Sequence, residues 1–124
     1  MAKWFNLIIG GVFGTVGRYA LSGLVYRIFG ANFPYGTLAV NLSGCFLIGF
    51  LAAISEEKFV LDTNARLLLM AGFCGAFTTF STFMLETANL IKTGENLAAF
   101  WNVAASISVG FLLFRLGVYL AEII

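Results

Sequence analysis

The stretch GFCGAFTTFSTF, residues 72–83, decides the fold of this chain. It lies within an uncharged run from Leu67 to Leu85, whose 19 residues match about one bilayer crossing. The centre of the run is rich in glycine and hydroxyl residues, which form helices poorly. Inside a membrane, non-helical backbone is tolerated only where it is buried in protein or lines a wet cavity, because every N–H and C=O needs a partner. The stretch therefore predicts a membrane helix that is broken near its centre.

A broken membrane helix is a common device at ion sites, because main-chain carbonyls lose their helical partners there. We expect the carbonyls between Gly75 and Thr78 to be freed in this way. A bound cation could satisfy them, and so could the neighbouring hydroxyl groups. Those hydroxyls belong to Thr78, Thr79, Ser81 and Thr82.

Three phenylalanines, Phe77, Phe80 and Phe83, recur every three residues, and this spacing places them on one face of a helix. In one interpretation the rings only pack against other side chains. In the other, the ring edges, which carry partial positive charge, attract a small anion beside the hydroxyl donors. Periodicity alone does not choose between the two.

The composition is that of an all-α integral membrane protein. Of the 124 residues, 60% are hydrophobic and 10% are charged, whereas soluble domains carry about 25% charged residues. The net charge of +1 does not indicate binding to nucleic acid, which usually requires a strongly basic surface. Because the chain has no histidine and no visible pair of carboxylates or nucleophile with a base, we expect it not to be an enzyme.

The length allows a single domain, residues 1–124, of four crossings with short loops. We expect the crossings at residues 4–26, 35–54, 67–91 and 97–120. The polar segment 55–66 is expected to be a solvated hairpin between the second and third crossings.

Polar residues inside the crossings each have two or more interpretations. Arg18 costs about 2.5–3.5 kcal/mol at membrane depth, so it either serves a function or reaches the membrane edge. Asn41 is either an interhelical hydrogen-bond partner or an anion donor. Glu86 could be a proton relay, a counter-charge for a cation or an interfacial cap. Gly10 and Gly14 predict a close approach of two helices.

The basic residues do not set an orientation. With four crossings, Lys3, Lys58 and Arg66 fall on one side of the membrane, and Arg27 and Lys92 fall on the other. The positive-inside rule therefore gives almost no bias. Such a chain can insert either way up, which predicts an antiparallel dimer.

Three segments carry a resemblance that covers the whole chain: GRYAL at 17–21, PYGTLAVN at 34–41 and GFCGAFTTFSTFMLE at 72–86. With these, the sequence resembles the Fluc/CrcB family of fluoride channels. The resemblance implies a dual-topology homodimer with two parallel pores. It also implies passive export of fluoride across a bacterial cytoplasmic (inner) membrane.

The resemblance further implies site residues. Those of the fluoride pathway are Thr37, Asn41, Phe80, Ser81, Thr82, Phe83, Glu86 and Ser108. Within this set the rings of Phe80 and Phe83 line the pore, and Asn41 is an amide donor in a vestibule. Glu86 stands at the end of the polar track.

A cofactor is implied in the same way. The backbone carbonyls of Gly75 and Thr78 resemble the ligands of a central, structural Na⁺ ion at the dimer interface, with two carbonyls from each subunit. Arg18 matches an arginine of the family, in a structural or vestibule role.

The main alternative is a proton-coupled exporter of the small multidrug type, which also has four short crossings and dual topology. Such a carrier needs an acid early in the chain, and the first crossing has Arg18 instead. A second alternative is an accessory subunit that only packs against a partner.

Overall fold

The computed structural model describes all residues, 1–124, and every regular element in it is a helix. Three helices are long and continuous: α1 (Ala2–Phe29), α2 (Tyr35–Glu56) and α6 (Asn96–Ile123). The third span is divided into α3 (Thr63–Arg66), η1 (Leu67–Cys74), α4 (Gly75–Phe77) and α5 (Phe80–Lys92). Four helical segments, counting residues 63–92 as one, are long and apolar enough to cross a membrane. The predicted all-α membrane architecture is confirmed.

Apart from the start of α2 at Tyr35, the spans extend one to four residues beyond their predicted ends. This changes the connection between the second and third spans. Ser55 belongs to α2 and is only 4% exposed. Asp62 caps α3 by accepting a hydrogen bond of 2.7 Å from the Ala65 N–H. The prediction that residues 55–66 form one solvated hairpin is therefore wrong at both ends, because helix continues into it from each side.

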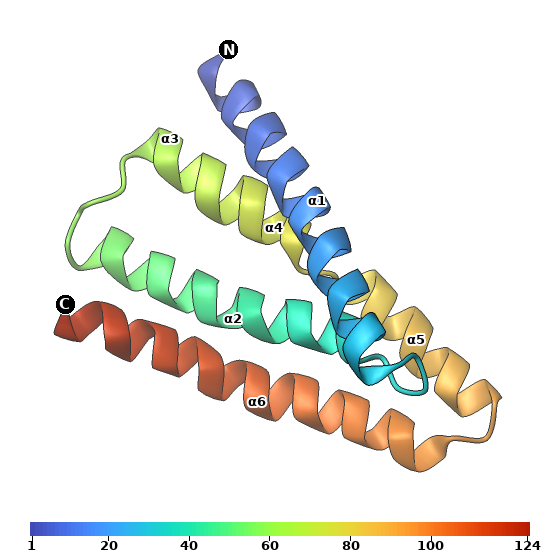
Figure 1. Cartoon of the computed structure of the whole chain (residues 1–124). Helices are drawn as coiled ribbons and strands as arrows, with labels where there is room; N and C mark the ends of the chain where they lie inside the picture. Colours follow the sequence, from blue (N-terminus) through green and yellow to red (C-terminus); the bar gives the residue numbers. More distant parts are fainter.

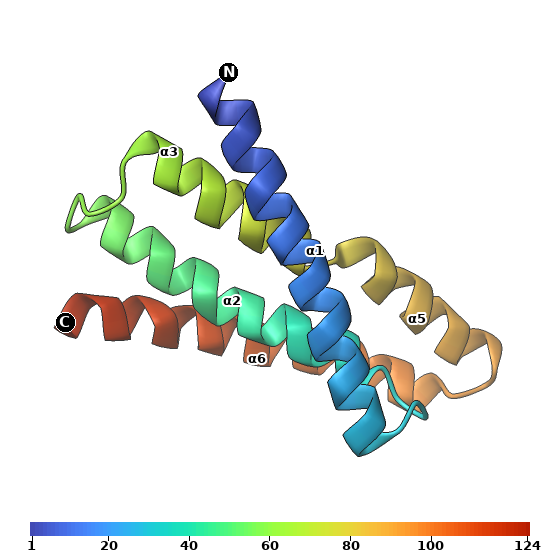
Figure 2. The ribbon, with the colours of Figure 1, turned by 45° about the horizontal axis from the view of Figure 1, so that its top comes forward.

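Two of the long helices, α2 and α6, lie side by side along most of their lengths, and α1 crosses the third span at η1 and α4 (Figures 1 and 2). Beyond residue 79, α5 leads away from this crossing and returns the chain to the start of α6 (Figure 1). The third span is thus bent, with its two halves packed against different neighbours.

The crossing between α1 and the third span depends on glycine. A Cβ atom on Gly10 would overlap the carbonyl oxygen of Leu68, and one on Gly14 would overlap that of Phe73. The two backbones are therefore in direct contact, as the small-residue spacing predicted. Gly117 of α6 lies equally close to the α2 backbone.

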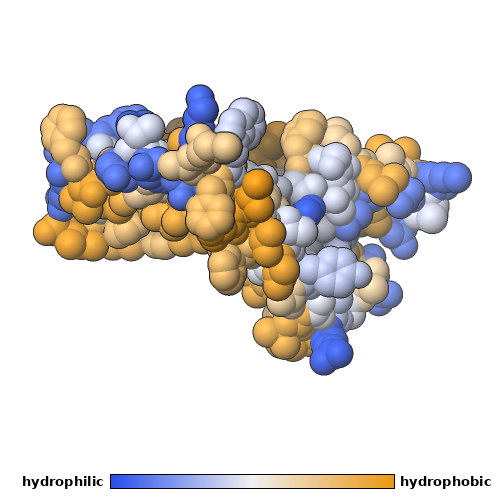
Figure 3. Space-filling view, turned by 90° about the horizontal axis from the view of Figure 1, so that it is seen from above, coloured by the Kyte–Doolittle hydropathy of each residue, from blue (hydrophilic) through white to orange (hydrophobic).

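The surface of the single chain is largely apolar. Only 21 of 124 residues are buried, and large hydrophobic side chains are exposed along α1, α5 and α6. Figure 3 shows apolar surface across much of the visible face, with hydrophilic residues mostly toward its edges. Such a surface requires lipid or another protein to cover it, in agreement with an integral, multi-pass membrane protein.

Candidate functional site

The third span is interrupted at two residues, which we call the break: Thr78 and Thr79. Thr78 has φ −84° and ψ 156°, and Thr79 has φ −147° and ψ 115°, so both are extended. The helix that ends at Phe77 and the helix that starts at Phe80 are therefore separate. The predicted interruption of the stretch 72–83 is confirmed.

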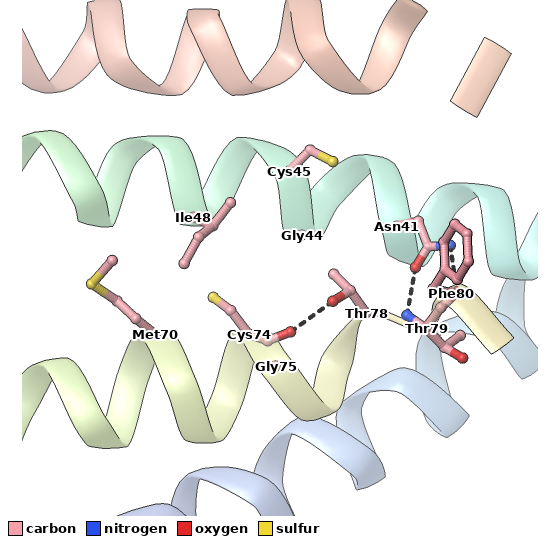
Figure 4. A pocket seen from close by; sticks show the side chains of 10 residues that line it. All are labelled: Asn41, Gly44, Cys45, Ile48, Met70, Cys74, Gly75, Thr78, Thr79 and Phe80. Atoms are coloured by element: carbon pink, nitrogen blue, oxygen red, sulfur yellow. Dashed lines mark hydrogen bonds between the residues drawn. The ribbon is translucent and has the colours of Figure 1, made fainter. Parts of the chain in front are cut away.

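Asn41 of α2 fills the place of the missing helical partners (Figure 4). Its Nδ2 donates to the carbonyl oxygen of Thr79 at 3.0 Å, and its Oδ1 accepts from the Thr79 N–H at 2.8 Å. In a continuous helix the Thr79 N–H would donate to the carbonyl of Gly75. Because Asn41 takes that N–H, the Gly75 carbonyl loses its α-helical donor.

Thr79 also begins the next helix. Its hydroxyl oxygen accepts from the Thr82 N–H at 3.2 Å, as expected of threonine at a helix N-cap. In a continuous helix that N–H would donate to the carbonyl of Thr78. No main-chain N–H donates to the Thr78 carbonyl in the structure.

The break frees the carbonyls of residues 75–78, because the last four carbonyls of a helix have no intrahelical donor. For Gly75 and Thr78 the former donor is taken by Asn41 and by the Thr79 hydroxyl. Carbonyl oxygens are the ligands that hard cations prefer. The donor set at the break fits a small monovalent or divalent cation of that class, such as Na⁺.

Both carbonyl residues line an open groove of about 360 Å³ between α2 and the third span (Figure 4). The groove is bounded by Asn41, Gly44, Cys45, Ile48, Met70, Cys74, Gly75, Thr78, Thr79 and Phe80. Phe80 is 74% exposed at its edge. A groove with amide and hydroxyl groups in its wall is unsuited to hydrocarbon, so it needs water or protein against it.

A second cavity, which we call the chamber, has a volume of about 290 Å³, and most of its lining residues are polar or charged. It is lined by Arg18, Tyr19, Ser22, Tyr26, Thr37, Val40, Thr79, Thr82 and Glu86. The Thr37 hydroxyl donates to Glu86 Oε1 at 2.8 Å. Thr79 is the one residue that lines both the groove and the chamber, so the break lies between them.

The predicted stripe of three phenylalanines on one face is wrong, because the break separates its first member from the other two. Phe77 is buried in α4 and stacks on Phe73 at a centroid distance of 5.3 Å. Phe80 and Phe83 are paired on α5 at 5.9 Å, with Phe83 only 6% exposed.

The predicted site residues fall into three groups. The groove contains Asn41, Gly75, Thr78 and Phe80, and the chamber contains Arg18, Thr37, Thr82 and Glu86. Phe83 is buried beside Phe80. Ser81 and Ser108 are exposed and line neither cavity, and the nearby Ser106 has a buried hydroxyl without a hydrogen-bond partner.

Sequence reasoning did not select two chamber residues of α1, Ser22 and Tyr26. Their spacing was the available signal, because Arg18, Ser22 and Tyr26 follow one another at intervals of four and so share a helix face. Sequence reasoning also missed that Thr79 both ends the interruption and caps α5. The available signal was the preference for threonine at helix N-caps.

Comparison with known protein families identifies the family of the chain. The model of the family described as CrcB-like protein, Camphor Resistance (CrcB), matches residues 5–118. The chain belongs to the CrcB family. The membership inferred from the three sequence segments is confirmed.

Curated relatives of this CrcB chain cover all or most of its length. A protein of Dehalococcoides mccartyi is 43% identical over all of this chain and 95% of its own length. One from Maridesulfovibrio salexigens is 40% identical over all of this chain and 98% of its own. One from Geobacter sp. (strain M21) is 46% identical over 86% of each. Each is named "Fluoride-specific ion channel FluC", the name of a transport protein and not of an enzyme.

Proposed function

We propose that this CrcB chain is a fluoride-selective channel that lets fluoride leave the cytoplasm passively, across the cytoplasmic (inner) membrane of a bacterium. The observation that carries the proposal is the identity of 40–43% over the whole chain with relatives named as fluoride-specific channels. The break adds physical support. It leaves main-chain groups unpaired within a membrane span, which is costly unless an ion or water binds to them.

The working unit is an antiparallel homodimer with two pores. The groove supports a partner subunit, since its amide, hydroxyl and carbonyl groups cannot face lipid. The even split of basic residues between the two membrane sides favours subunits of opposite orientation.

A structural Na⁺ ion lies at the centre of that dimer, held by the carbonyls of Gly75 and Thr78 from each subunit. The freed carbonyls at the break support this assignment. When bound, the ion supplies a fixed positive charge near the pores, which lowers the cost of bringing an anion into the membrane.

Fluoride is strongly hydrated, so the pathway must supply hydrogen bonds as water is lost. The amide of Asn41 has one N–H left after it bonds to Thr79. Thr37 and Thr82 present hydroxyls to the chamber. The ring edges of Phe80 and Phe83 attract the anion weakly between these donors.

The remaining pathway residues and Arg18, which was predicted in a structural or vestibule role, contribute from the two ends. Arg18 and Glu86 both line the chamber. Their opposite charges balance each other there. Ser81 and Ser108, exposed on the single chain, reach the pathway from the surface that the partner subunit covers.

The test is fluoride efflux, followed with a fluoride electrode, from liposomes that contain only this protein. We expect fast fluoride release that needs no proton gradient, with chloride retained. Release of chloride at the same rate would contradict selectivity. Slow release that requires a proton gradient would support the small multidrug-type carrier, and no release would support an accessory subunit.

A further inference from the structure

A third cavity, which we call the mouth, opens at the end of the bundle where α1 meets α2 and α5 meets α6. Its volume is about 620 Å³. It is lined by Tyr26, Ala31, Asn32, Phe33, Pro34, Glu86, Asn89, Leu90, Thr93 and Glu95. Tyr26 and Glu86 are the two residues that line both the mouth and the chamber. They form the neck between the two cavities.

The ring of Tyr26 is fixed in this neck by close packing. A Cβ atom on Gly36 of α2 would overlap the Tyr26 ring, so the ring lies directly on the α2 backbone. Glycine at position 36 thereby lets the Tyr26 side chain reach past α2 toward α5. The hydroxyl at its tip points to the Glu86 carboxylate, 60 residues further along the chain.

The two hydroxyls that reach Glu86 do so with different strength. Thr37 donates to Oε1 at 2.8 Å, a short hydrogen bond. Tyr26 donates to the same oxygen at 3.4 Å, which is long for an O–H···O bond and correspondingly weak. Thr37 therefore holds the carboxylate in place, while the Tyr26 hydroxyl can change its acceptor at little cost.

We propose that Tyr26 is a further fluoride-binding residue, whose hydroxyl donates to fluoride as the ion passes from the mouth to the chamber. This inference rests on the proposed channel function. An anion in the neck meets the negative charge of Glu86, and a hydrogen-bond donor beside that charge offsets the repulsion. The phenol provides such a donor without adding a charge that would trap the ion.

The experiment compares Tyr26→Phe with wild type in liposome efflux. The phenylalanine ring keeps the packing on Gly36 and removes only the hydroxyl. We expect fluoride efflux to fall about 10- to 100-fold, the effect of one lost hydrogen bond to a charged group. Tyr119→Phe makes the same chemical change on α6, at a side chain that is 58% exposed and lines none of the three cavities, and is expected to match wild type.

A structural role for the Tyr26 hydroxyl is distinguished by Tm and by the dimer fraction in size-exclusion chromatography. Slower efflux with Tm and dimer fraction as in wild type supports the proposal. Slower efflux together with a lower Tm or loss of dimer would overturn it, and so would efflux at the wild-type rate. If wild type itself releases no fluoride, the channel function fails and this inference fails with it.

Discussion

The two halves of the third span are held by different kinds of contact. Before the break, η1 and α4 lie directly on the backbone of α1, where Gly10 and Gly14 leave no room for a side chain. After the break, α5 is joined to its neighbours by hydrogen bonds between side chains, from Thr37 to Glu86 and from Asn102 to Thr87. Asn41 connects the halves by bonding to the main chain of the break.

The difference indicates a division of roles. Backbone contact fixes the position of the first half, whose available polar groups are main-chain carbonyls beside the break. The hydroxyl, amide and carboxylate groups on the second half line cavities that an ion can enter. Substitutions that fill the contact with α1 should therefore change stability, and substitutions of the cavity-lining groups and the paired rings of the second half should change conduction.

The largest effect on conduction is expected at the paired rings of α5. Phe80→Ile or Phe83→Ile removes the ring edges and should reduce fluoride efflux to the level of protein-free liposomes, with the dimer intact. Phe73→Ile, on the other side of the break, is the matched control and should retain conduction. Undiminished efflux through both α5 variants would remove the rings from the pathway.

Asn41→Asp tests the residue that joins the halves. A carboxylate cannot donate to the Thr79 carbonyl, and it adds a negative charge where an anion passes. We expect fluoride efflux to fall by roughly 10- to 100-fold, as for a lost hydrogen bond to a charged group of about 1.5–3 kcal/mol. A normal fluoride current through this variant would exclude Asn41 from the pathway.

Gly10→Ala tests the first half. The added methyl group meets the Leu68 carbonyl, and overpacking of this kind costs about 1–3 kcal/mol. The Tm in detergent should fall. Gly11→Ala, one residue along the same helix, has no atom within 4 Å of its new methyl group and should leave the Tm unchanged. Equal Tm values for the two variants would contradict the backbone contact.

Thr87→Val tests the packing of α5 on α6. It removes the acceptor of the buried Asn102 amide at 2.9 Å, which in membrane proteins is worth about 1 kcal/mol. A small fall in Tm with fluoride efflux close to wild type is expected. Thr15→Val makes the same change at an exposed position of α1 that lines none of the three cavities, and it is the control. A large loss of conduction in Thr87→Val would show that this bond positions the pathway as well.

The spans, the existence of the break and the glycine contact of α1 could be predicted, because each depends on residues close together in the sequence. Hydropathy gives the spans, the glycine and threonine content of residues 72–83 gives the break, and the spacing of Gly10 and Gly14 gives the close approach.

The register of the break could not be predicted, because its position at Thr78 and Thr79 depends on Asn41, which lies 38 residues earlier. For the same reason, the prediction of one stripe of phenylalanines included residues on both sides of the break. The π-helical winding of η1 was not predicted from the sequence. In it the Gly75 N–H donates to the Met70 carbonyl. The meeting of Tyr26 with Glu86 likewise requires the fold.

The most direct test of the account is fluoride efflux through a variant in which the break has lost both groups that hold it open. Asn41→Leu with Thr79→Ala removes the amide that binds the Thr79 main chain and the hydroxyl that caps α5. Measured beside wild type in the same liposomes, this double variant is predicted to release no fluoride. Release at the wild-type rate would contradict the claim that the break makes the pathway.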